Sequence, residues 1–414
     1  MRVIQLTTYP LKSPRHGGQL RCAAIRERYR QSGVDVETIA VMHEGQYRAS
    51  ERERNDIALP GSSKFWNLEH ERFVDLQTGQ CLAGDSHSYG LFAGLLERLR
   101  PDAIQLEQPW LYPAVKRYFA DRRADSSARP RLIYSSQNIE WKLKRDERRS
   151  QAPDANAHAL NVAQVEALEH EVVSQSDMIV ACTQDELGEL REMASDDMDA
   201  QPRLYVTAPN AIAPFEPDPD RLRGLKRRHG LDRFPLFVGS AHPPNADGFW
   251  EMLAPSLSFL RPDERIVVAG GVGHFLRNHA IYQSWSGINE PRLLVLGEIE
   301  REDLVALLHG AAAILLPITA GGGSNLKTAE AIYTGSPVVA TTHALRGYGE
   351  ASRWPTIAIA DTPETFRRTL REMLDRDGPA VSAAYSDIRA AVTWERALTP
   401  LADALEALLK PRAR

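Results

Sequence analysis

Short apolar runs alternate along this chain with longer segments in which apolar residues recur at helical spacing. The first series of runs predicts β-strands at Val3–Leu6, Val34–Val41, Asp102–Leu106, Arg131–Tyr134, Met178–Cys182 and Leu204–Val206. The second series predicts strands at Leu236–Gly239, Arg265–Ala269, Leu293–Leu296, Ile314–Pro317, Pro337–Ala340 and Thr356–Ala360. Strands that alternate with helices in this way predict parallel sheets covered by helices on both faces.

A stretch that is rich in proline and acidic residues, Ala211–Asp220, separates the two series and has the composition of a hinge. We therefore predict an α/β protein of two doubly wound, Rossmann-like domains that face a central cleft. Residues 1–210 form the first predicted domain and residues 211–393 the second, and a helix within residues 394–414 is expected to cross back to the first. Ligands of such sheets bind beyond the carboxyl ends of the strands, which places the expected site in the cleft.

Composition narrows the classes of function. The 414 residues include 50 Lys and Arg against 55 Asp and Glu, and a net charge of -5 argues against bulk binding of nucleic acid. Cys22, Cys81 and Cys182 are widely spaced, so we expect reduced, buried thiols and neither a disulfide framework nor a zinc site. No apolar run is long enough to span a membrane, and the first residues read as a strand and not as a signal peptide. We expect a cytoplasmic protein, with peripheral contact at the inner face of the membrane left open.

The most informative segment follows the predicted strand that ends at Pro317. Three glycines, Gly321–Gly323, allow the backbone to approach a ligand closely, and Ser324 or Asn325 would cap the helix that follows. The free N–H groups of a first helical turn attract an anion. Lys327 and Glu330 are three residues apart and share one face of this helix, so a phosphate and a ribose could be held side by side. The alternative is an ordinary strand–turn–helix with charged surface residues.

The same segment, GGGSNLKTAEAIYTGSPVVAT, resembles the donor-site signature of GT-B glycosyltransferases of family 4. Weaker similarities occur in order along the chain in TYPLKSPRHGGQLR, SSQNIEW, SDMIVACTQDE, APNAI and FVGSAHPPNADG. The resemblance implies a retaining, metal-independent transferase that uses a nucleotide-diphosphate sugar as donor and needs no separate cofactor. The first domain would bind a glycan or lipid-linked acceptor and the second the donor. A role in cell-envelope polysaccharide synthesis is the expected context.

Matching positions assign roles to particular residues. Lys327 and Arg15 would stabilise the charge of the leaving diphosphate as the catalytic pair, and Glu330 would bind the donor ribose. The remaining residues assigned to the donor are Gly17, Gly18, Gly321, Gly322, Gly323, Ser324, Asn325, Leu326, Ser240, His242 and Asn245. The candidates on the acceptor side are Glu107, Gln137, Asn138 and Glu140.

Three departures from the family pattern affect these assignments. Gly322 stands where many members have the first glutamate of an E-x7-E motif, and His242 and Asn245 follow the first donor strand where many have an arginine and a lysine. The phosphate charge would then rest on Arg15, Lys327 or Arg346. Gln137 replaces a histidine of the family and cannot act as a base, although it can bind a sugar hydroxyl.

Two other functions fit the same fold. One is a nucleotide-sugar 2-epimerase, which Gln137 disfavours, and the other is a non-catalytic protein that binds a nucleotide sugar or a glycan. No pattern predicts an oligomeric state.

Two charged motifs are interpreted as solvated surface. Asp197–Asp199 and Asp218–Asp220 both spell DxD, but neither follows a donor-site strand, so we expect no metal site. The basic run 142–149 could contact an anionic membrane or a lipid-linked acceptor, although its interleaved acids favour a solvated helix face.

Overall fold

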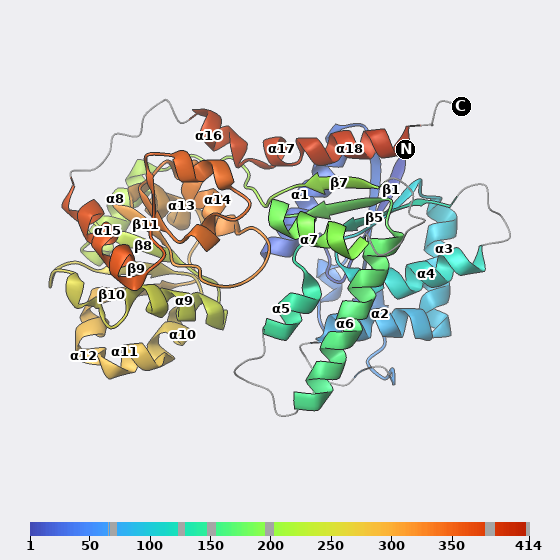
Figure 1. Ribbon diagram of the computed structural model, residues 1–414, viewed down its shortest axis with the longest axis horizontal. Coiled ribbons are helices and arrows are strands. Elements are labelled where there is room, and N and C mark those ends of the chain that lie inside the picture. The colour runs from blue at the N-terminus through green and yellow to red at the C-terminus, as the bar shows by residue number, and fades with distance from the viewer. Residues whose placement is uncertain are drawn as a thin grey trace. The chain divides into compact units, whose positions relative to one another are not determined.

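The computed structural model describes residues 1–64, 66, 73–122, 129–146, 155–194, 203–376 and 386–410. The chain divides into two compact units, of which the first comprises Met1–Pro209 with Leu398–Arg414 and the second Asn210–Ala397 (Figure 1). The predicted boundaries lay at residues 210 and 393. The motif Asp197–Asp199 and the end of the basic run, residues 147–149, lie outside the described residues.

A parallel sheet with the strand order β3-β2-β1-β4-β5-β6-β7 forms the centre of the first unit. The chain order reverses between β1 and β4, where Val3 is in register with Ala103. The strands are β1 (Arg2–Thr7), β2 (Asp35–His43), β3 (Ile57–Leu59), β4 (Ala103–Leu106), β5 (Arg131–Ser135), β6 (Met178–Ala181) and β7 (Leu204–Thr207).

Helices surround this sheet and bury its aliphatic side chains in one large core. They are α1 (Gly17–Gln31), α2 (Val74–Gly84), α3 (Ser86–Leu99), α4 (Tyr112–Asp121), α5 (Glu140–Asp146), α6 (Ala155–Gln175) and α7 (Gln184–Ala194). The last helix of the chain, α18 (Thr399–Leu409), also belongs to this unit and packs against β7 and α1 (Figure 1).

The second unit contains a parallel sheet with the order β10-β9-β8-β11-β12-β13, in which the chain order reverses between β8 and β11. Apolar clusters cover both of its faces. Its strands are β8 (Pro235–Val238), β9 (Ile266–Ala269), β10 (Leu293–Gly297), β11 (Ala313–Leu316), β12 (Val338–Ala340) and β13 (Ile357–Ile359).

The helices of the second unit follow its strands in turn. They are α8 (Pro219–His229), α9 (Pro243–Leu253), α10 (Gly273–Asn278), α11 (Ala280–Ser284), α12 (Ser286–Asn289), α13 (Arg301–Gly310), α14 (Leu326–Thr334), α15 (Pro363–Asp375), α16 (Ser386–Ala391) and α17 (Trp394–Ala397). Gly248 lets α9 approach the end of β11, because a Cβ there would lie 2.3 Å from the Pro317 carbonyl oxygen.

Two doubly wound α/β units confirm the predicted fold class. Each predicted strand is present, with ends that differ by at most two residues. Strand β3 was not predicted, because three residues are too few to establish an alternating pattern.

Candidate functional site

The predicted glycine segment lies at the point of the second sheet where the chain order reverses. Strands β8 and β11 are parallel neighbours there, with Leu236 in register with Ile314. The loops that follow them, residues 239–242 and 317–325, therefore leave the same edge of the sheet. An open α/β sheet binds its ligands at such a reversal. The fold thus places the segment with the strongest sequence signal at the most favourable position of this unit.

The loop between β11 and α14 depends on glycine. Gly321 has a φ of 105° and Gly323 a φ of 63°, a region that other residues rarely adopt. Helix α14 begins at Leu326 with Asn325 as its N-cap and ends before Gly335, which has a φ of 71°. The Asn325 side chain does not cap the helix. Of the two residues expected to cap the helix, Asn325 occupies the N-cap position, although its side chain forms no capping hydrogen bond.

Lys327, in the first turn of α14, connects the two loops. Its ammonium donates a hydrogen bond to Oδ1 of Asn245 at 2.5 Å. Asn245, in the first turn of α9, donates in turn to the carbonyl oxygen of Ser240 at 3.1 Å. Burial, together with the nearby charge of Arg346, lowers the pKa of Lys327 to about 8. A poorly solvated cation with a neutral amide as partner would be stabilised by a bound anion.

Ser240 and His242 are exposed at this same edge. His242 is the N-cap residue of α9, and its backbone N–H donates to the Ser240 carbonyl oxygen at 2.7 Å. The loop that was expected to bind the donor therefore lies beside Lys327.

Glu330 lies one turn after Lys327 on α14 and is 13% exposed. Its carboxylate forms an ion pair with Arg301, the first residue of α13. Arg301 itself is 48% exposed and lies over the ring of Phe215. A ribose bound to Glu330 would share its carboxylate with Arg301 or displace the arginine, which the sequence did not indicate.

Ser324 anchors the glycine loop and does not face open space. It is buried, and its Oγ accepts a hydrogen bond from the backbone N–H of Asn210 at 2.7 Å. The Asn210 side chain donates to the Ser324 carbonyl oxygen at 2.5 Å, and the Tyr348 hydroxyl donates to the Asn210 carbonyl oxygen at 2.5 Å. Asn210 belongs to the motif APNAI, so this motif anchors the glycine loop through Ser324. Tyr348 carried no sequence signal.

Candidates in the first unit gather at the start of α1. Gly17 is the first residue of α1, and His16 caps it by accepting from the N–H of Gln19. A Cβ at Gly18 would lie 2.7 Å from both Oε1 of Gln137 and the hydroxyl oxygen of Tyr9, so a larger residue here would require these side-chain ends to shift. The sequence identified this glycine through the resemblance alone.

Arg15 precedes this turn. Its side chain is 74% exposed and forms an ion pair with Glu51 at 3.2 Å. A guanidinium with this exposure can change partners at little cost.

Gln137 and Asn138 follow β5. The Gln137 amide donates to the Tyr9 hydroxyl at 2.6 Å, and the Asn138 carbonyl oxygen accepts from the Ser136 hydroxyl at 2.5 Å. Both side chains are half-buried. Gln137 therefore lies beside Gly18, as a residue that contacts a ligand at this turn would.

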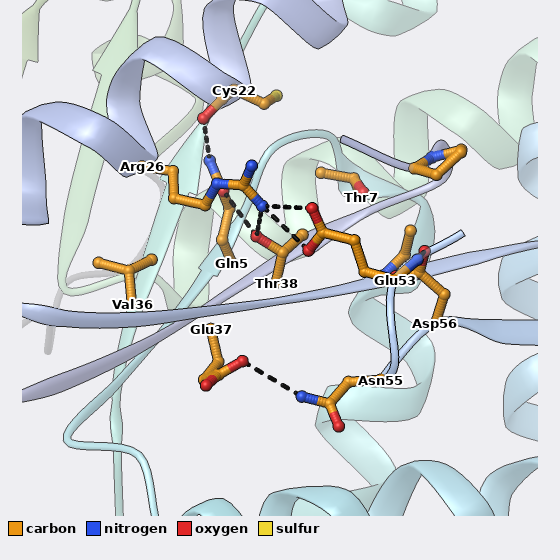
Figure 2. A network of polar contacts seen from close by, with 12 residues as sticks. Gln5, Thr7, Cys22, Arg26, Val36, Glu37, Thr38, Glu53, Asn55 and Asp56 are labelled. Atoms are coloured by element: carbon orange, nitrogen blue, oxygen red, sulfur yellow. Dashed lines mark hydrogen bonds and ion pairs between the residues drawn. The ribbon is translucent and has the colours of Figure 1, made fainter. Parts of the chain in front are cut away.

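Glu107 differs from its expected placement at an open cleft, because it is fully buried. Its Oε1 accepts hydrogen bonds from the side-chain amides of Gln5 and Gln105, each at 2.6 Å. Figure 2 shows that Gln5 also donates to the Cys22 carbonyl oxygen and accepts from the Thr38 hydroxyl. Burial raises the pKa of Glu107. Glu107 therefore links side chains of β1 and β4, and Gln5 in turn links β1 to α1.

Glu140 is also buried, as the first residue of α5. Its backbone N–H donates to Oε1 of Glu169 at 3.1 Å. Both carboxylates proposed as acceptor-side candidates, Glu107 and Glu140, are therefore buried in the first unit.

Within the described ranges, no three His, Cys, Asp or Glu side chains are arranged to hold a metal ion. The three cysteines are buried and are not joined in disulfide bonds, and Asp218 acts as the N-cap of α8. No described helix is both long and apolar enough to cross a bilayer.

Residues 233–376 match the model of the family described as Glycosyl transferases group 1. No curated protein sequence matches the chain.

Solved structures resemble the chain along its whole length. The structure titled "Trehalose-6-phosphate from E. coli bound with UDP-2-fluoro glucose" is 13% identical, with 100% of each chain covered and a TM-score of 0.66. Anabaena Alr3699/HepE in complex with UDP and glucose is 14% identical, with 98% of this chain and 99% of the other covered and a TM-score of 0.65. WaaG, a glycosyltransferase involved in lipopolysaccharide biosynthesis, is 16% identical, with 98% and 97% covered and a TM-score of 0.60. Identities at this level show a shared fold.

Proposed function

We propose that the second unit of this chain binds a nucleotide-diphosphate sugar, because residues 233–376 match the Glycosyl transferases group 1 model and the chain has the GT-B fold. The enzyme transfers the sugar, with retention of configuration and without a metal, to a glycan or lipid-linked acceptor held by the first unit. WaaG, which acts in lipopolysaccharide biosynthesis, supports a similar role in cell-envelope polysaccharide synthesis. UDP in the Anabaena structure makes uridine nucleotides the first donors to test.

The observation that carries this proposal is the environment of Lys327. The fold brings its ammonium to the reversal of the sheet beside the glycine loop, where Asn245 is its partner at 2.5 Å. Its lowered pKa shows that burial and Arg346 disfavour the charged form. A diphosphate would relieve both effects.

The transfer leaves negative charge on the departing diphosphate. Lys327 and the backbone amides at Ser324, Asn325 and Leu326 are fixed before the reaction, so they stabilise this charge without reorganisation. Glu330 accepts hydrogen bonds from the ribose. In this proposal Gly17, Gly18 and Arg15 complete the diphosphate site, and Gln137 binds an acceptor hydroxyl.

The test is a panel of UDP-, GDP-, ADP- and dTDP-sugars followed by thermal unfolding, with sugar hydrolysis measured in parallel. A ligand at about 100 times its dissociation constant adds about 2.7 kcal/mol of stability. We expect one nucleotide to stabilise the protein and its sugar to be released slowly. Glu330→Ala should lower the affinity for that nucleotide about 10- to 100-fold, since hydrogen bonds to a charged group contribute about 1.5–3 kcal/mol.

Glu302→Ala is the matched control, because Glu302 is exposed on the first turn of α13. Unchanged affinity in Glu330→Ala would contradict the assignment of α14. Binding without hydrolysis or transfer to any acceptor would instead favour a non-catalytic nucleotide-sugar-binding protein.

A further inference from the structure

The segment that follows β12 holds the glycine loop by its backbone carbonyl groups. It comprises Thr341, the short helix η6 (Thr342–Leu345) and Arg346. The Thr341 hydroxyl donates to the Ile318 carbonyl oxygen at 2.5 Å. Nε2 of His343 lies 3.0 Å from the Gly321 carbonyl oxygen, and Nη2 of Arg346 donates to the Gly322 carbonyl oxygen at 2.8 Å. Three carbonyl groups of one loop thus face one segment.

These contacts fix the direction of the peptide units. In a trans peptide the C=O and N–H bonds point in opposite directions. Because the Gly321 carbonyl faces His343, the N–H of Gly322 points away from η6. The same geometry turns the N–H of Gly323 away from Arg346. Successive N–H groups on one side of a loop form a concave site for an anion.

Glycine makes this constraint necessary. Three consecutive glycines lose more backbone conformational entropy on ordering than any other three residues. If the loop were disordered without ligand, this entropy would be lost on binding and would weaken the affinity. Arg346 is itself held, because its Nη1 donates to the His343 carbonyl oxygen at 2.7 Å. The Thr328 hydroxyl of α14 donates to the Ala344 carbonyl oxygen at 2.8 Å. Hydrogen bonds therefore connect η6 to both the glycine loop and helix α14.

We infer that His343 and Arg346 are positioning residues for the donor diphosphate, a role that rests on the proposed function. They hold Gly321–Gly323 so that the N–H of Gly322 is turned toward the phosphate that is farther from the nucleoside. Arg346 also adds positive charge beside Lys327. Sugar release from the nucleotide depends on this order of the loop as much as on the charge.

The nature of each contact dictates the variants. A carbonyl oxygen only accepts, so Nε2 of His343 carries a proton, and a glutamine amide can replace it. His343→Gln should therefore keep the contact that His343→Ala loses. Arg346→Lys keeps the charge but lacks the planar fork whose two terminal nitrogens each donate to a separate carbonyl group. Arg346→Gln loses both.

The experiment compares affinities for the nucleoside diphosphate selected by the panel and for the matching monophosphate. His343→Ala and Arg346→Gln should each bind the diphosphate about tenfold more weakly, while affinity for the monophosphate changes less than about twofold. His343→Gln should bind both nucleotides as the unchanged protein does, and Arg346→Lys should recover only part of the loss. Arg353→Gln is the control, because Arg353 is 78% exposed and pairs with Glu350.

Two results would overturn the inference while leaving the proposed function intact. One is tight diphosphate binding by Arg346→Gln, and the other is full recovery by Arg346→Lys, which would show that charge alone matters. If the unchanged protein binds no nucleotide, the proposed function itself fails. Equal unfolding temperatures across the set exclude a folding defect as the cause of any loss.

Discussion

Two charged side chains of this protein, Lys327 and Glu107, have opposite environments. Glu107 is fully buried, and two amide groups donate to one oxygen of its carboxylate, while the other oxygen is buried without a hydrogen-bond partner. Lys327 has an amide oxygen as its partner and a second cation close by. Of the two side chains, Lys327 is therefore the one whose charged form a bound anion would stabilise.

Binding of a diphosphate should be coupled to protonation of Lys327. The pKa of about 8 in the free protein should rise when an anion binds, so protons are taken up. At pH 8.5 about a quarter of the free lysines carry a proton, and uptake should approach ~0.7 proton per nucleotide. Uptake should vanish toward pH 6.5, where the lysine is already charged. Calorimetric titrations in two buffers of different ionisation enthalpy measure this number.

Lys327→Met should abolish the uptake at pH 8.5 and weaken binding. Lys226→Met, on α8 of the same unit, should leave both unchanged. An equal proton count in Lys327→Met and the unchanged protein would show that another group titrates.

At the scale of single elements, buried side chains complete the ends of helices that the local sequence leaves open. Ile139, which precedes helix α5, has no side-chain acceptor, and Glu169 of α6 accepts from the N–H groups of Glu140 and Trp141, each at 3.1 Å. The Tyr134 hydroxyl donates to the same carboxylate at 2.6 Å. Burial outweighs these donors and raises the pKa of Glu169 to about 7.

This shift makes the stability of the first unit depend on pH. The folded pKa of Glu169 lies above the unfolded value, so its contribution is complete below about pH 4.5 and is lost as the pH rises through 7. Relative to Glu169→Gln, the unchanged protein should lose on the order of 3 kcal/mol of unfolding free energy between pH 5 and pH 8. Urea unfolding at these two pH values measures the difference.

The control variant is Glu171→Gln on the same helix, where Glu171 is 40% exposed and pairs with Lys116. It should follow the unchanged protein at both pH values. Parallel pH profiles for Glu169→Gln and the unchanged protein would assign the dependence to another group.

At the scale of the whole molecule, a helix that follows the second unit in the sequence packs in the first unit. Helix α18 follows the second unit in sequence but packs against β7 and α1 of the first unit (Figure 1). Leu401, Ala402 and Leu405 form its buried side. The stability of the first unit therefore depends on residues that follow the second unit in the sequence.

Deletion of residues 398–414 should destabilise the first unit selectively. Three buried leucines, Leu398, Leu401 and Leu405, account for about 4.5–9 kcal/mol, at roughly 1.5–3 kcal/mol for each side chain. Scanning calorimetry with and without the selected nucleotide should show a lowered transition for the first unit, and a transition of the second unit that the nucleotide still raises. A chain that ends at Lys410 keeps α18 and is the control. Loss of the nucleotide effect on deletion would mean that the second unit also needs α18.

The amino-acid sequence by itself determined the strands, the two α/β units and the segment that holds Lys327. Apolar periodicity and glycine positions are local signals, so they can be read along the chain. Only the tertiary structure decided which polar groups meet. Burial of Glu107, the ion pair of Glu330 with Arg301, and the contacts of His343 and Arg346 with the glycine loop join residues that are distant in sequence. Such partners depend on how strands and helices pack, and no local pattern encodes that packing.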